Sequence, residues 1–157
     1  MNRKVRIGIF VTLILLQIIV QKYMDILKVS LDLLYLIVVY ISVKSGFFKT
    51  VFTATTIGLV TDYFSMQVMG VFGFSRTIIG FLLNDTSRHI DLKNSMFVFL
   101  LIAISLSLSN TISNVFFYFI RGIAFNLNLI LYQPLLTGLT GVLILAVPKV
   151  KRYLDVY

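Results

Sequence analysis

The residue types that could do acid–base or metal chemistry are scarce in this sequence. It has 6 acidic residues, all aspartate, one histidine, His89, and no cysteine. Disulfides, thiolate metal sites and an imidazole metal cluster are therefore excluded. The carboxylate that raises a question is Asp62, in the stretch GLVTDYFSMQVMG, because long apolar runs flank it on both sides. A carboxylate in such a place either destabilises the chain or serves a purpose.

The composition indicates an integral membrane protein. Hydrophobic residues make up 59% of the 157 residues and charged residues 13%, whereas a soluble domain is about 45–50% apolar and about 25% charged. The formal net charge is +8, but the basic residues lie at the ends of apolar runs and form no patch, which argues against nucleic-acid binding. The elements that position Asp62 must therefore be sought within a bilayer.

Six apolar segments are candidates for membrane-spanning helices, since a span needs about 17–25 residues and every backbone polar group must be satisfied within lipid. They are 7–22, 29–43, 46–61, 68–83, 95–120 and 123–147. The fold class predicted is an all-α, compact six-transmembrane-helix bundle, with residues 1–157 forming a single polytopic membrane domain. The first segment follows a basic start but lacks a small-residue cleavage site, so we interpret it as a retained span.

The distribution of basic residues predicts which side of the membrane each loop occupies. If the N-terminus is cytoplasmic, most basic residues fall on the cytoplasmic side: Arg3, Lys4, Arg6, Lys44, Lys49, Arg88, Lys93, Lys149, Lys151 and Arg152. Lys22, Lys28 and Arg121 fall on the opposite side. Because positive residues favour the cytoplasm in short loops, both termini are expected there. A five-span alternative merges two of the short segments and puts the termini on opposite sides.

One face of the third segment combines small residues with Asp62. Ala54, Gly58 and Asp62 are spaced i, i+4 and i+8, and small residues mark faces where membrane helices pack closely. Asp62 is thus expected to point into the bundle, where either pairing with Arg76 or capping of the next helix would offset the cost of burial. The alternative is a solvated Asp62 at the membrane boundary with a snorkelling Arg76. Asp32 is interpreted as an acid in the first turn of the second segment, favourable to its dipole.

Polar side chains also run along the last two segments. They are Ser105, Ser109, Ser113, Asn110 and Asn114 in the fifth, and Asn126, Asn128, Gln133, Thr137, Gly138 and Gly141 in the sixth. We interpret them as contacts between helices, with a polar transport pathway as the alternative. Pro134 predicts a kink, and His89 is expected to be a solvated loop residue.

No catalytic constellation is recognisable. An intramembrane protease needs paired aspartates, or a serine with a histidine or lysine, at the depth of the bundle. Asp32 and Asp62 are both expected at its outer edge, and His89 in a cytoplasmic loop. We therefore expect no enzyme and no cofactor.

The segment Leu31–Leu82 resembles the MreD family of bacterial rod shape-determining membrane proteins. The family shows a Pro-Asp opening an apolar helix, a basic turn with glycine and then a G-x-x-x-D-x-x-S-x-x-x-x-G signature. Asp32 matches the opener and Gly46 the turn, and the signature falls on Gly58, Asp62, Ser65 and Gly70. Two positions depart from the family pattern. Leu31 stands where proline is usual, and Phe72 stands where a histidine often follows the second glycine of the signature. The motif covers about a third of the chain, and beyond about residue 90 the similarity is one of hydropathy.

The resemblance implies a non-enzymatic scaffold of the cell-elongation complex in the bacterial cytoplasmic membrane. Its partners would be an MreC-like single-span protein, a RodA-type glycan polymerase with its penicillin-binding transpeptidase and, indirectly, MreB filaments. Family motif and interface residues would be Asp32, Gly46, Ala54, Gly58, Asp62, Ser65, Gly70 and Arg76. We hypothesise that packing at Ala54 and Gly58 shapes a groove for a partner's transmembrane helix.

The resemblance also supplies an alternative function. The MreD fold resembles the substrate-binding subunits of energy-coupling-factor vitamin transporters, so such a subunit is the second candidate. Those subunits commonly carry an alanine-x-x-x-alanine motif in the first span, and IGIFVTLILLQIIV contains no alanine. This difference weighs against the transporter.

Overall fold

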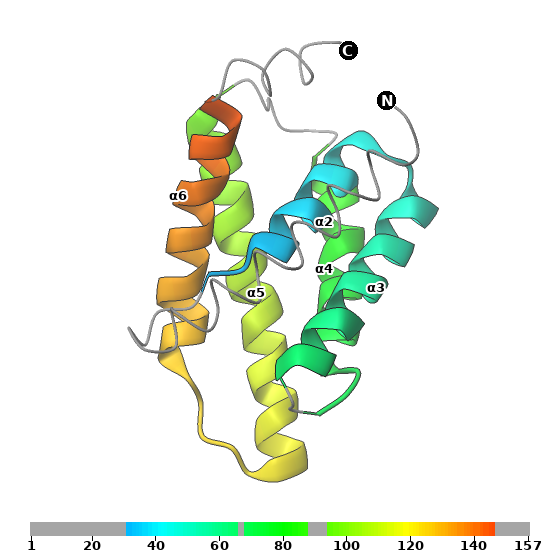
Figure 1. Cartoon of the computed structure of the whole chain (residues 1–157), viewed down its shortest axis with the longest axis vertical. Helices are drawn as coiled ribbons and strands as arrows, with labels where there is room; N and C mark the ends of the chain where they lie inside the picture. The colour runs from blue at the N-terminus through cyan, green and yellow to red at the C-terminus, as the bar shows by residue number, and fades with distance from the viewer. Residues whose placement is uncertain (1–30, 66–67, 88–93, 147–157) are drawn as a thin grey trace.

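The computed structural model describes residues 31–65, 68–87 and 94–146, which form helices and no strands. The helices are α2 (Leu33–Lys44), α3 (Phe47–Ser65), α4 (Val71–Thr86), α5 (Ser95–Arg121) and α6 (Gln133–Ala146), with a π-helical turn, η1 (Asn128–Tyr132), before α6. Figure 1 shows them as an elongated bundle. The all-α class is thereby confirmed for this part of the chain.

Five of the six predicted segments coincide with helices, and the first, 7–22, lies outside the described residues. The three short segments are separate helices, α2, α3 and α4, so the merger assumed in the five-span alternative does not occur. The breaks fall at Ser45–Gly46 and before Val71, where the sequence places turn residues.

Among the described helices, α5 is the one both long and apolar enough to cross a bilayer by length and composition. The helix α2 and the stretch Asn128–Ile144 are apolar but shorter. The six-span count therefore remains a prediction. So does the cytoplasmic location of the two termini, which lie outside the described residues.

The segment predicted as one helix over 123–147 is interrupted. The chain leaves α5 at Gly122, whose φ of 64° suits glycine, and residues 122–126 are not helical. A π-turn follows, in which the N–H of Gln133 donates to the carbonyl oxygen of Asn128. Pro134 lacks an N–H and follows this π-turn with no break in the helix. Local π geometry can accommodate a proline within a membrane helix, and the kink predicted at Pro134 stays a prediction.

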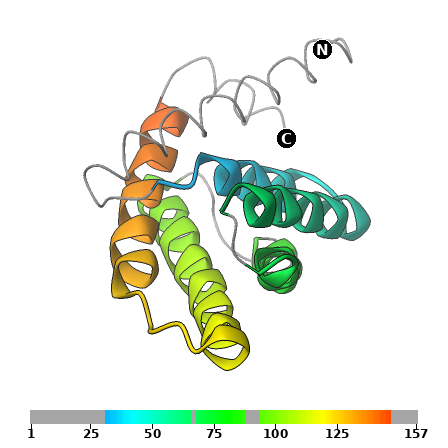
Figure 2. The same cartoon turned by 60° about the horizontal axis from the view of Figure 1, so that its bottom comes forward.

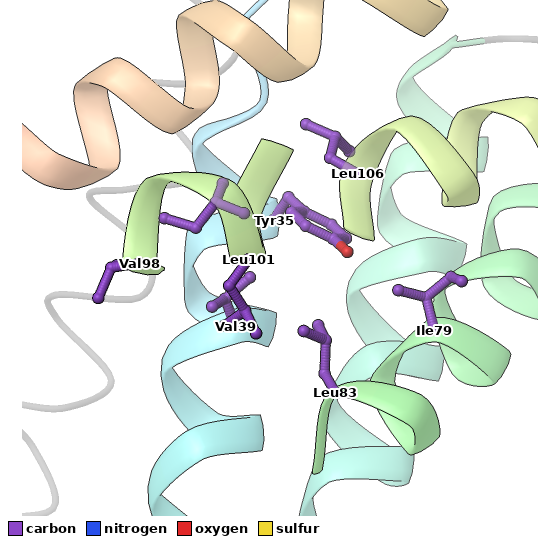
Figure 3. Packing of buried hydrophobic residues seen from close by; sticks show 8 residues of the cluster. Tyr35, Val39, Ile79, Leu83, Val98, Leu101 and Leu106 are labelled. Atoms are coloured by element: carbon purple, nitrogen blue, oxygen red, sulfur yellow. The ribbon is translucent and has the colours of Figure 1, made fainter. Parts of the chain in front are cut away.

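The helices pack in two neighbouring pairs, α3 with α4 and α5 with α6, with α4 also against α5 (Figures 1 and 2). A hydrophobic core joins α2, α4 and α5 (Figure 3). It consists of Tyr35, Val39, Ile79, Leu83, Val98, Leu101, Ile102 and Leu106. This core holds α4, which carries Arg76, between the other two helices.

The bundle has polar side chains inside and large apolar side chains outside. Arg76, Thr50 and Ser75 are among the most deeply buried residues, while Phe48 and Phe119 are 84% and 79% exposed. In a water-soluble protein charged residues are almost never fully buried. The distribution agrees with a surface that faces lipid.

Candidate functional site

Asp62 caps the amino end of α4. Its carboxylate accepts hydrogen bonds from the backbone N–H groups of Gly70 (3.0 Å), Phe72 (2.9 Å) and Gly73 (3.0 Å). The first N–H groups of a helix have no partner within the helix, and its dipole favours a negative charge there. Of the alternatives open from the sequence, capping is therefore the one the structure contains, and Asp62 is 2% exposed rather than solvated.

The glycine and serine of the signature shape the same turn. Gly70 has a φ of 97°, in the left-handed region that disfavours residues with a Cβ atom. Ser65, the last residue of α3, donates its hydroxyl to the carbonyl oxygen of Asp62 at 3.2 Å. The spacing from Asp62 to Gly70 thus ends one helix and begins the next.

Ala54 and Gly58 lie against α4 of the same chain. A Cβ atom on Gly58 would come within 2.5 Å of both Gly73 Cα and the carbonyl oxygen of Phe72. One on Gly80 would lie 2.9 Å from Ala54 Cβ. The groove predicted here for a partner's helix is therefore wrong, because α4 already fills it.

Arg76 pairs with Asp32. Its Nη2 contacts the Asp32 carboxylate, and its Nη1 donates to Thr61 Oγ1 at 2.7 Å. The guanidinium carbon lies 5.8 Å and 5.6 Å from the ring centroids of Tyr35 and Phe72, within cation–π range. The predicted Asp62–Arg76 pair is wrong because Asp62 is already used by the α4 amides. Snorkelling is also wrong, since Arg76 is 1% exposed.

Asp32 has more roles than its expected one at the start of α2. Its side chain accepts from the Tyr35 N–H at 3.0 Å as the cap of α2, and its own N–H donates to Thr137 Oγ1 in α6 at 3.2 Å. The sequence indicated a favourable charge at the start of α2, but not the side-chain cap. The pair with Arg76 joins residues 44 positions apart, and no local spacing signals it.

Asn84 of α4, which the sequence did not single out, holds the turn between α2 and α3. The Gly46 carbonyl oxygen accepts from the N–H groups of Lys49 and Thr50. From α4, Asn84 Nδ2 donates to the carbonyl oxygens of Ser42 and Ser45, both at 2.8 Å. Asn84 could have been identified from its position in an apolar run, because a buried amide needs hydrogen-bond partners.

The polar residues of α5 mostly connect helices. Ser113 shares a 2.7 Å hydrogen bond with Ser75 of α4. Asn110 Nδ2 donates to the Leu129 carbonyl oxygen and to Gln133 Oε1, and Asn114 Oδ1 accepts from the Asn126 N–H. These contacts agree with the helix-contact interpretation rather than the transport pathway. His89 lies outside the described residues.

The buried carboxylates of the described residues have partners that hold helices together. Within the described ranges, no three histidine, cysteine, aspartate or glutamate side chains gather as a metal site. The two buried carboxylates face a guanidinium and backbone amides respectively. Asp32 thereby joins α2 to α4, and Asp62 joins α3 to α4.

Comparison with known proteins gives one match. No curated protein and no solved structure matches the chain. The sequence profile of the family described as rod shape-determining protein MreD matches residues 3–155, well beyond the third of the chain that carries the motif. The match gives no support to the vitamin-transporter alternative. The chain therefore belongs to the MreD family of membrane proteins, whose role is in determining rod shape.

Proposed function

We propose that this chain is a non-enzymatic, multi-pass scaffold of the cell-elongation complex in the bacterial cytoplasmic membrane. It binds an MreC-like single-span protein and a RodA-type polymerase with its penicillin-binding transpeptidase, and through them it is linked to MreB filaments. In this role it organises lateral peptidoglycan synthesis. Family membership supplies the shape-determining role, and the partners are the proposal.

The proposal rests on one observation: the buried charged side chains bind groups of this same chain. Asp62 binds three amides of α4, and Asp32 binds Arg76 and caps α2. Ionisable residues within a membrane usually mark transport or proton pathways. Here they join α2, α3 and α4, as expected for a rigid body that others dock on.

A hollow beside the Asp62 turn supports the proposal of a docked partner helix. It has a volume of about 310 Å³ and is lined by Val68, Met69, Gly70, Val71, Phe74, Phe116 and Ile120. It contains the signature glycine, Gly70, which lets another backbone approach closely. We place the MreC-like transmembrane helix here, beside the Asp62 turn, in place of the groove that α4 fills.

Filling this hollow tests the proposal. Ile120→Trp adds bulk to its wall, and Ile104→Trp is the matched control, since Ile120 and Ile104 are 54% and 57% exposed on the same helix. We expect Ile120→Trp to lower recovery of the MreC-like partner severalfold and to widen cells at unchanged protein level. The Ile104→Trp control should keep both at wild-type values. Equal recovery from the two variants would reject this docking site.

The topology can be tested separately because the chain has no cysteine. A single cysteine at Ser45 should react with an impermeant thiol reagent from the cytoplasmic side. One at Gly122 should react from the opposite side. The reverse pattern would contradict the predicted orientation.

A further inference from the structure

The exposed face of α3 carries a hollow distinct from the one beside Gly70. It has a volume of about 710 Å³. Its lining residues are Phe48, Lys49, Val51, Phe52, Thr55, Thr56 and Leu59. Phe48 and Phe52 are 84% and 74% exposed, and α3 lies at the edge of the bundle in Figure 1. Within the described part of the chain, this face is therefore open to a ligand from the membrane.

The threonines of this face present little polarity. Thr55 Oγ1 donates to the Val51 carbonyl oxygen at 2.8 Å. It also lies 2.7 Å from Thr77 Oγ1 of α4, in a hydrogen bond between the two hydroxyls. Thr56 Oγ1 donates to the Phe52 carbonyl oxygen at 2.8 Å. Because these hydroxyls are bound within the bundle, their methyl groups and the aromatic rings dominate the surface of the hollow. Its chemistry suits a hydrocarbon chain.

The lining of this hollow contains no glycine, alanine or serine, and its threonine hydroxyls are already bound. Membrane helices associate through small residues and hydrogen bonds between side chains. The small residues of α3, Ala54 and Gly58, point to α4 instead. A flexible acyl chain can fit between bulky side chains, whereas close packing of a helix is favoured by small residues along the seam.

The length and charge of the hollow agree with a lipid. From Phe48 to Leu59 the helix rises about 16 Å at about 1.5 Å per residue, and one leaflet occupies half of a hydrocarbon core about 30 Å thick. Lys49 lies at one end of the lining, and Lys44 is exposed at the same turn. The apolar hollow is therefore about as long as one leaflet is thick, and the basic residue at its end can pair with a lipid phosphate.

We propose that the exposed face of α3 binds an anionic phospholipid. One acyl chain lies along the hollow between Phe48 and Leu59, and the headgroup phosphate contacts Lys49. No catalysis is involved, and the site is independent of the partner surface proposed beside Gly70. The lipid would then occupy a fixed position on the shape-determining complex.

Native mass spectrometry of the full chain tests this site. The protein is released from micelles after incubation with equal amounts of phosphatidylglycerol and phosphatidylcholine of the same chain lengths. We expect phosphatidylglycerol to be retained in preference. Lys49→Gln should lower the ratio of the two bound lipids about fivefold, the equivalent of the ~1 kcal/mol that one basic residue contributes near an anionic surface. Lys49→Arg should keep the ratio.

Two further variants separate the site from general charge effects. Arg121→Gln removes another exposed basic residue, at the end of α5, and should leave the ratio unchanged. Thr56→Phe adds bulk to the hollow and should lower retention of both lipids. The proposal is overturned if the wild type shows no preference, or if Lys49→Gln and Arg121→Gln behave alike. It is also overturned if a photoreactive residue at Phe52 crosslinks in membranes to a protein, including a second copy, in place of lipid.

Discussion

The α3–α4 pair and the α5–α6 pair are both neighbouring helices, but different interactions hold them together. Between α3 and α4, Gly58 brings the backbones into direct contact and Asp62 binds three amides of the next helix. Between α5 and the chain that follows it, neutral amides such as Asn110 and Asn114 bridge an irregular connection. The first pair is fixed by a charge and by backbone contact, and the second by neutral hydrogen bonds and by Gly138 and Gly141 packed against side chains of α5.

This difference ranks how strongly each contact contributes to stability. A charge buried in lipid is costly unless it is paired, whereas a hydrogen bond between membrane helices contributes only about 0.6 kcal/mol on average. The half of the bundle that contains the ionic groups should therefore lose most when one group is removed. Four substitutions test the ranking, with stability measured by unfolding in detergent.

The largest loss should follow Arg76→Met. It leaves Asp32 buried without its cation, and breaking a buried ion pair on one side costs about 3–5 kcal/mol. Adding Asp32→Asn in the same chain should restore a substantial part of the loss, since the uncompensated charge is then gone. A double variant less stable than Arg76→Met alone would show that the pairing is not what stabilises α2 against α4.

Asp62→Leu comes next, with an expected loss of about 2–3 kcal/mol, because hydrogen bonds to a charged group are worth about 1.5–3 kcal/mol. Asp62→Asn should lose less. Its one amide oxygen can still accept from Gly70 and Gly73, which share a single carboxylate oxygen, while Phe72 bonds to the other. Equal losses for the two variants would contradict the capping geometry.

Gly58→Ala should cost about 1–3 kcal/mol, the usual range for overpacking. The added methyl group would meet the backbone of Gly73, which cannot move aside as a flexible side chain can. Gly46→Ala is the matched control, because a Cβ atom there has no heavy atom within 4 Å. Similar unfolding midpoints for the two variants would show that the helices are not in backbone contact.

The smallest effect is expected in the α5–α6 pair. Asn110→Leu removes the bonds to Leu129 and Gln133 and should cost about 1 kcal/mol. Thr111→Val, whose hydroxyl bonds only to the Ser107 carbonyl oxygen of its own helix among the contacts described, should change stability by less than about 0.5 kcal/mol. A loss for Asn110→Leu as large as that for Asp62→Leu would remove the contrast between the two pairs.

The same contrast explains how much of the fold could be predicted from the sequence. Hydropathy located α2, α3, α4 and α5 to within four residues of their ends, because each apolar segment must satisfy its own backbone in lipid, but it placed the start of the last helix ten residues too early. Capping by Asp62 was one of the alternatives that the sequence left open, since Asp62 and the three amides that it binds lie within twelve residues of each other. The break at residues 122–126 was missed because those residues are as apolar as a helix, and only Gly122 with its positive φ hinted at it.

The sequence predicted which charged residues belong to the candidate site, but not which of them pair with each other. Asp32, Asp62 and Arg76 stood out as charges among apolar residues. Which acid faces Arg76 depends on how α2 lies across α4, and that arrangement follows from packing around Tyr35 and Ile79. Likewise, the small residues of α3 predicted a close contact, and the sequence could not tell a helix of the same chain from a partner's.

We propose that the buried charges of Asp32, Asp62 and Arg76 hold the bundle together and take no further part in function. Replacing both members of the ion pair, in Asp32→Asn with Arg76→Met, removes the charges and leaves the Asp62 turn intact. In cells producing this variant at wild-type level, we predict normal width and full recovery of the MreC-like partner. Rounded cells or a lost partner, with the purified variant still folded and at least as stable as Arg76→Met, would contradict the claim.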